Sequence, residues 1–172
     1  MIEIKKIVID KPSGFGKVDT VLPGESTEVD ELMKSVTDGT LIIATYIKPL
    51  MEWFEFLKNH GKDPVIITGK TRKRLGELIK GGIIIPKVVL ATDTITYGTS
   101  FNFYHTEILL DIPWSRGKLL QRIYRIIRRG SEYMDKKIYL IGTKQKFERI
   151  EKKLGFASLV EHVRGFNYEG AW

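Results

Sequence analysis

Short apolar runs alternate along the chain with longer stretches in which apolar and polar residues recur at helical spacing. The apolar runs are rich in isoleucine, valine and leucine, and most end in glycine or small polar residues, which is typical of buried strands. We expect strands at six such runs, which are residues 2–9, 41–44, 65–69 with its terminal turn, 87–91, 107–112 and 137–142.

The stretches between these runs predict helices. Ser26 or Thr27 caps a helix that runs to about residue 36, and Pro49 opens another that ends at His60 and Gly61. The remaining predicted helices are a short one ending at Lys80, one at residues 115–130, one at 145–154, and a short one within 156–172 followed by a tail. Strands that alternate with helices predict a single three-layer α/β domain over residues 1–172, with a mostly parallel sheet and helices on both faces.

Composition narrows the class of protein. The 172 residues suit one domain with a sizeable core, and the net charge of +7 favours a polyanionic partner. The absence of cysteine excludes disulfides and thiolate metal sites, and the three histidines lie far apart. The charged N-terminus lacks the apolar core of a signal peptide, and no apolar run is long enough to span a bilayer. We therefore expect an intracellular protein without a membrane partner.

The predicted helix that begins after Ser115 and stops at Gly130 is unusually basic. Residues 112–131 contain six basic residues and no acid, so these cations repel one another unless an anion is present. At helical spacing, one arc is apolar and predicted to be buried: Leu120, Ile123, Tyr124 and Ile127. Another arc faces away from it: Gln121, Arg125 and Arg128, with Arg122 and Arg129 beside them. A plain basic surface face is the alternative interpretation.

The strand at residues 87–91 opens into a small polar loop, Thr92 to Ser100, that contains Gly98. Such a loop places hydroxyls and backbone N–H groups at the carboxyl edge of a sheet, where α/β proteins bind ligands. The strand at residues 107–112 leads through Trp114 into the arginine-rich helix. Trp114 is either a base-stacking or interface aromatic or, as we expect, a tryptophan at the edge of the core.

Together these segments resemble the second, C-terminal RecA-like domain of superfamily-two helicases and translocases, with features of the Swi/Snf-type ATPases. Residues 89–93 with Gly98 are similar to motif V, and Gln121, Arg122, Arg125, Arg128 and Gly130 are similar to motif VI. Asp111, Trp114 and Ser115 are similar to the link between these motifs, residues 41–57 to motif IV, and residues 67–71 to the segment that follows motif IV. Tyr124 and Ser100 depart from the pattern, which has glycine and often aspartate there. The resemblance covers residues 41–143 and leaves 144–172 as a C-terminal helix and tail.

The resemblance implies roles for individual residues. In the family, ATP lies between two RecA-like domains, and the second supplies arginine fingers, here Arg125 and Arg128, with Gln121 as a γ-phosphate sensor. Arg122 is expected to have a structural ion-pair role. Residues implied to couple ATP to the nucleic-acid track are Thr92, Asp93 and Gly98. Residues implied to contact the phosphates of DNA or RNA are Thr68, Lys70 and Thr71.

The first RecA-like domain of the family supplies a P-loop and the acidic motif that holds Mg²⁺ with ATP. Gly14 to Lys17 is superficially similar to a P-loop, but Lys11 stands at its first glycine position and Val18 at its final hydroxyl position. We therefore expect the C-terminal half of an ATP-dependent helicase or translocase, inactive without a P-loop-bearing domain elsewhere. The alternative is a non-catalytic nucleic-acid-binding or regulatory module with the same fold.

Overall fold

The structure of the chain is a computed structural model. It describes residues 2–10, 18–69, 79–80, 83–93, 101–127 and 135–168. Of the predicted site residues, Lys70, Thr71, Gly98 and Arg128 lie outside these ranges, as does the P-loop-like segment from Gly14 to Lys17.

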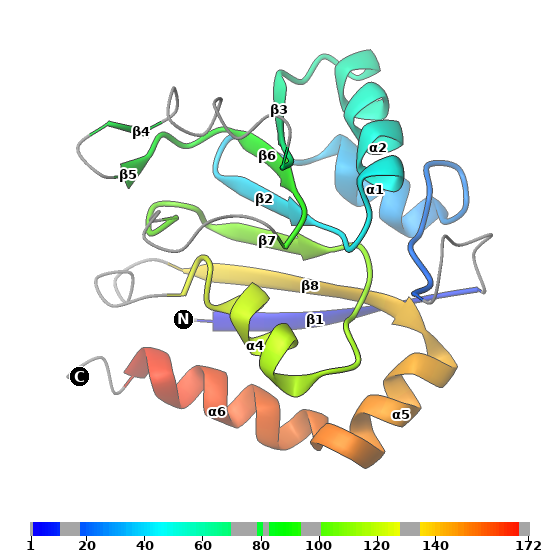
Figure 1. Cartoon of the computed structure of the whole chain (residues 1–172), viewed down its shortest axis with the longest axis vertical. Coiled ribbons are helices and arrows are strands. Elements are labelled where there is room, and N and C mark those ends of the chain that lie inside the picture. The colour runs from blue at the N-terminus through cyan, green and yellow to red at the C-terminus, as the bar shows by residue number, and fades with distance from the viewer. Residues whose placement is uncertain are drawn as a thin grey trace.

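A six-stranded sheet forms the centre of the domain (Figure 1). Its strands, in spatial order, are β1 (Ile2–Ile9), β8 (Lys136–Thr143), β7 (Thr106–Leu109), β2 (Thr40–Ile43), β6 (Val88–Ala91) and β3 (Pro64–Ile67). Every neighbouring pair is parallel. All six predicted strands are therefore confirmed, and all of their carboxyl ends meet at one edge of the sheet.

Helices cover both faces of this sheet (Figure 1). On one face lie α1 (Thr27–Lys34) and α2 (Ile47–Asn59), and on the other lie α4 (Arg116–Ile123), α5 (Lys144–Leu154) and α6 (Phe156–Tyr168). The three-layer α/β architecture predicted from the alternation of strands and helices is confirmed.

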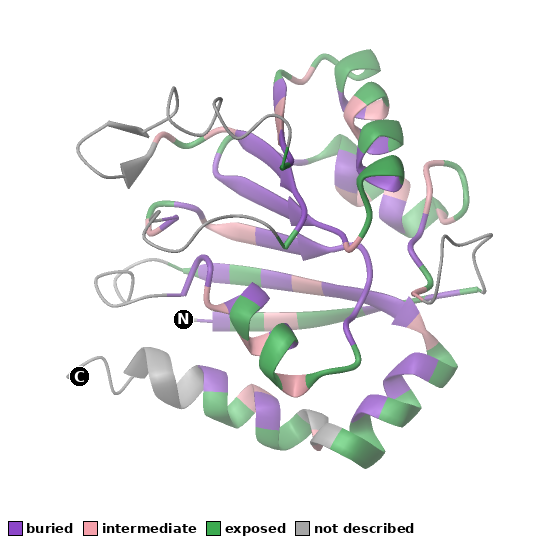
Figure 2. Ribbon diagram, viewed as in Figure 1, coloured by how far each residue is buried: buried purple, intermediate pink, exposed green. Residues whose placement is uncertain are grey.

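The apolar runs are continuous because successive side chains of a strand enter different cores. In β2, Leu41 and Ile43 pack with the helices α4, α5 and α6, whereas Ile42 packs with α1 and α2. The largest buried side chain, Trp53 of α2, donates its indole N–H to the carbonyl oxygen of Val21 at 2.8 Å. Figure 2 shows the result: the inner strands are buried, and α1, α2 and α5 expose only their outer surfaces.

Several helix ends agree with the sequence. Ser26 caps α1 by accepting a hydrogen bond from the backbone N–H of Val29, and Ser115 caps α4 by accepting one from the N–H of Lys118. Helix α2 begins two residues before Pro49 and is followed by His60 and Gly61, and Gly155 adopts a positive φ of 61° between α5 and α6. At the C-terminus, α6 is a full helix of 13 residues rather than a short one.

Two predictions about helices are wrong. Helix α4 ends at Ile123 instead of continuing to Gly130, because residues 124–126 form a turn in which the N–H of Arg125 bonds to the carbonyl oxygen of Arg122. The second wrong prediction is a helix that ends at Lys80. Ile79 and Lys80 instead form the short strand β4, which is antiparallel to β5 (Ile83–Ile84). Within the described ranges, no helix is both long and apolar enough to cross a lipid bilayer.

Candidate functional site

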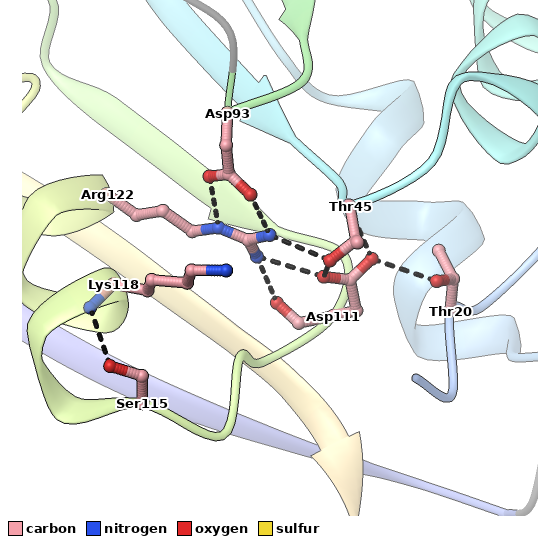
Figure 3. Close-up of polar contacts among 7 residues, drawn as sticks. All are labelled: Thr20, Thr45, Asp93, Asp111, Ser115, Lys118 and Arg122. Carbon is pink, nitrogen blue, oxygen red and sulfur yellow. Dashed lines mark hydrogen bonds and ion pairs between the residues drawn. The ribbon is translucent and has the colours of Figure 1, made fainter. Parts of the chain in front are cut away.

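Three polar side chains lie just beyond the carboxyl ends of three neighbouring strands. Thr45 follows β2, Asp93 follows β6 and Asp111 follows β7. Arg122, from α4, reaches across the sheet edge and touches all three (Figure 3). The carboxyl edge of a parallel sheet is where α/β proteins bind their ligands, so this cluster marks the candidate site.

The guanidinium of Arg122 uses all five of its N–H donors. It holds Asp93 with two parallel bonds of 2.8 Å, one from Nε and one from an Nη. The other Nη donates to the backbone oxygen of Asp111 at 2.8 Å and to its carboxylate at 2.9 Å, and the fifth bond goes to the Thr45 hydroxyl at 2.9 Å. Because Arg122 is only 1% exposed and fully bonded, its role is structural, in agreement with the expected ion-pair role.

Asp111 is the second centre of the network. Its buried carboxylate also accepts bonds from the backbone N–H of Thr45 at 2.9 Å, from the Thr45 hydroxyl at 2.7 Å and from the Thr20 hydroxyl at 2.8 Å. Burial disfavours the charge of Arg122, but the hydrogen bonds that it donates to Asp93 and the charge of Asp111 outweigh burial and raise the pKa of the guanidinium. The network therefore joins four separate segments of chain to α4 (Figure 3).

The predicted finger residue Arg125 does not face away from the core. It is 7% exposed, because the chain turns after Ile123 and carries residue 125 inward. Of the other predicted residues, Gln121 is exposed and Thr68 and Thr92 are buried, while the side chain of Asp93 remains 45% exposed. The structure thus joins Arg122 to Asp93 directly, whereas Gln121 is exposed and, among the described residues, is not part of this hydrogen-bonded cluster.

Glu107 is a buried carboxyl group that the sequence interpretation missed. It lies in β7, is completely buried, and neither of its oxygens accepts a hydrogen bond from the described residues. Burial raises the pKa of the Glu107 carboxyl well above its ordinary value, and the charges of Arg122 and Arg125 only partly oppose this shift. The sequence places Glu107 directly before the apolar pair Ile108 and Leu109, which indicates a position within a strand but not the lack of a hydrogen bond.

Lys136, at the start of β8, is also fully buried. Its ammonium donates hydrogen bonds to the backbone oxygens of Asn102, at 2.6 Å, and Tyr104. Burial lowers the pKa of Lys136 to about 8, although the nearby Glu107 acts in the opposite direction. Histidine, aspartate and glutamate side chains form no cluster of three that could hold a metal ion in the described part of the chain.

Comparisons with known proteins agree with this arrangement. The family described as "Helicase conserved C-terminal domain" matches residues 26–130. The uncharacterized ATP-dependent helicase YqhH of Bacillus subtilis (strain 168) is 32% identical in an alignment of 136 residues, and this alignment covers 76% of this chain and 23% of YqhH. The chain thus spans about a quarter of the length of this curated relative.

Two solved structures share the fold. The C-terminal part of the Fun30 ATPase domain superposes with a TM-score of 0.58 at 14% identity, over 83% of this chain and 52% of that one. S. cerevisiae Dbp5 bound to RNA and ADP BeF3 superposes with a TM-score of 0.62 at 15% identity, over 95% of this chain and 39% of that one. The parallel sheet, with an arginine-centred network at its carboxyl edge, is the RecA-like fold of these domains. Because the family match covers more than half of its length, the chain belongs to the helicase C-terminal domain family.

Proposed function

We propose that this chain is the C-terminal half of an ATP-dependent nucleic-acid helicase or translocase, working with a P-loop-bearing RecA-like domain in cis or in trans. The observation that carries the proposal is the set of five bonds made by Arg122. These bonds fix the arginine-rich segment against the loops that follow β6 and β7. A segment held in this way is positioned before any ligand arrives, which is what electrostatic catalysis requires.

Within this function, Arg125 and Arg128 act as arginine fingers and Gln121 senses the γ-phosphate. Gln121 is exposed and lies one residue before the fixed Arg122, so its amide is accessible to a ligand at the sheet edge. The partner domain holds ATP and Mg²⁺ for the most part, and ATP supplies the phosphoryl group that is transferred. Guanidinium groups stabilise the charge that spreads over this group, by ~10³- to 10⁵-fold in rate when a finger is supplied in trans.

Thr92, Asp93 and Gly98 couple this site to the nucleic acid. Both carboxylate oxygens of Asp93 bind Arg122, so a movement of the loop after β6 acts directly on α4. Thr68 follows β3 at the same edge of the sheet, and with Lys70 and Thr71 it contacts phosphates of DNA or RNA. In support of this, Asp93 and Thr68 follow the neighbouring strands β6 and β3 at one edge of the sheet.

The second candidate is a non-catalytic nucleic-acid-binding or regulatory module. Two observations favour it: Arg125 is buried in the absence of a partner domain, and Tyr124 stands where the family motif has glycine. In this case the arginine-rich segment would not take part in catalysis. Its basic residues would either stabilise the domain or form a basic surface.

The two candidates differ in what Arg125 does, so ATP turnover in a complex with the P-loop domain tests them. We expect Arg125→Ala to lower turnover by about 10³-fold or more, with nucleic-acid binding retained. Arg129→Ala, which removes a neighbouring arginine outside the proposed fingers, is the matched control and should have a small effect.

Because Arg125 is buried, each variant also needs a stability measurement on the chain alone. Arg125→Lys keeps a positive charge at the position, and it should fold while remaining deficient in turnover. If Arg125→Ala unfolds the chain and Arg125→Lys restores both folding and full turnover, Arg125 is a structural cation. Equal and small losses for Arg125, Arg128 and Arg129 would instead favour the non-catalytic module.

A further inference from the structure

Trp114 lies at the centre of a group of positive charges. It follows β7, just before the N-cap of α4, and its side chain is 39% exposed, so it is not the core-edge tryptophan expected from the sequence. Three cations of α5 surround its indole ring. The Nζ of Lys146 lies 2.9 Å from the ring centroid, the guanidinium carbon of Arg149 5.3 Å, and the Nζ of Lys153 5.8 Å.

The spacing of these residues explains why they meet. Lys146, Arg149 and Lys153 stand at positions i, i+3 and i+7 of α5, which share one face of a helix. A hollow of about 390 Å³ opens on this face, lined by Trp114, Arg149, Lys152 and Lys153. None of the described residues that line it is acidic. The two glutamates of α5 lie elsewhere, in a second hollow with Lys144 and Phe147: Glu148 and Glu151.

Lys146 is the most confined of these cations. It is 8% exposed, and among the described residues its ammonium has neither a hydrogen-bond acceptor nor an ion-pair partner. Burial lowers the pKa of Lys146 to about 8, the charges of Asp111 and Asp19 oppose this shift, and the charges of Arg149 and Lys153 add to it. Contact with an aromatic face contributes only ~0.5–2 kcal/mol per cation. The cations around Trp114 therefore repel one another, and a bound anion would reduce this repulsion.

We propose that the pocket formed by Trp114, Arg149, Lys152 and Lys153 binds a segment of single-stranded nucleic acid. The three cations of the pocket contact its phosphates, and a base packs against the exposed part of the Trp114 indole. Cations beside an accessible aromatic ring are the combination that single-strand-binding proteins use. An acidic peptide would satisfy the cations but would leave the tryptophan without a specific partner. The volume is at the lower end of the ~300–1,000 Å³ typical of ligand pockets, which suits one nucleotide unit.

This pocket is separate from the nucleic-acid contact proposed above, although the inference rests on the proposed nucleic-acid function. Helix α5 follows β8, whereas Thr68 follows β3, and the strands β7, β2 and β6 lie between them. Strands are ~4.8 Å apart, so the two contacts are about 19 Å from each other along the sheet edge. One nucleotide cannot reach both, and the pocket therefore adds a second point of attachment beyond the arginine-rich helix.

Binding of a fluorescein-labelled oligothymidylate of about 16 nucleotides to the full chain tests the inference, measured by anisotropy at several salt concentrations. Arg149→Glu and Lys153→Glu should each weaken binding at least tenfold and lower the slope of log affinity against log salt by about one. Trp114→Leu should weaken binding by about 5- to 150-fold without changing this slope, because stacking releases no counterions. Lys58→Glu is the matched control, since Lys58 is an exposed lysine 5.5 Å from the ring of Phe54 on the opposite face of the sheet. It should change binding little.

Circular dichroism must show that each variant remains folded. Binding that survives all three changes to the pocket would overturn the inference and leave the helicase function intact. A wild-type chain that binds no oligonucleotide would overturn both. If polyglutamate of equal charge displaces the oligonucleotide as well as unlabelled oligothymidylate does, the pocket is an acidic-peptide site and the inference is wrong.

Discussion

Arg122→Met removes the guanidinium that joins the ends of β2, β6 and β7 while keeping most of the apolar stem. The variant leaves the carboxylate of Asp111, whose side chain is fully buried, without its ion-pair partner. Removing one partner of a buried ion pair costs ~3–5 kcal/mol. Asp93 adds less, because its side chain is 45% exposed and solvent screens the charge.

A loss of this size is a large share of the stability of a domain, which is typically ~5–15 kcal/mol. Urea unfolding followed by circular dichroism should show a lower midpoint at an unchanged m-value, and the melting temperature should fall by roughly 6–20 °C. Lys118→Met, on the same helix but exposed, is the control and should change the free energy of unfolding by less than ~0.5 kcal/mol.

The cost of Arg122→Met should depend on the charge of Asp111. In an Asp111→Asn background the orphaned carboxylate is gone, so the further loss caused by Arg122→Met should be smaller by about 0.5–3 kcal/mol. If Arg122→Met costs no more than Lys118→Met, or if its cost is the same in both backgrounds, the network does not hold the arginine-rich segment in place, and the argument for a preorganised site fails.

Two further predictions concern stability. Burial raises the pKa of Glu107 in the folded state above its value in the unfolded chain. The folded state is therefore destabilised as the pH rises from the unfolded-state pKa toward the folded-state pKa, because the buried carboxyl must either stay protonated or carry a buried charge. Glu107→Gln should therefore unfold less readily than the wild type by ~1–4 kcal/mol at pH 8, with little gain at pH 4, whereas the exposed Glu55→Gln should show no such difference. Gly39 has φ of 95°, and an added Cβ would lie 2.8 Å from a neighbouring imidazole, so Gly39→Ala should cost ~1–3 kcal/mol or more. Gly61→Ala, where φ is 76° but the space is open, should cost less in the same urea titration, and equal losses would contradict the clash.

The sheet was predictable from the sequence because its strands are buried on both faces. A run such as Leu41 to Ala44 has no polar position to place on a solvent face, so its composition alone indicates an inner parallel strand. Likewise, Ser26 and Ser115 lie immediately before amphipathic stretches, and their caps depend on local chemistry that the sequence displays.

The failures arose where tertiary contacts override periodicity. The spacing of apolar residues continues past Ile123, but the chain turns there, and this brings Arg125 inward against the predicted orientation. The partners of Arg122 were equally hidden, because Asp93 and Asp111 meet it only through the order of the strands. No local pattern indicated that Glu107 would be buried without a hydrogen bond, since that depends on the packing of other segments around β7.

The pairing of β1 with β8 has a consequence for how the protein is made. Ile2 lies opposite Lys136 and Ile9 opposite Thr143, so β1 leaves the ribosome well before the strand that it pairs with in the described part of the chain. At translation rates of ~5–20 residues per second, β1 waits roughly 7–25 s for that neighbour. During this time its unpaired backbone groups and its apolar residues are available to other chains. Expression yield should therefore depend on how fast translation proceeds between β1 and β8, independently of the stability of the finished domain.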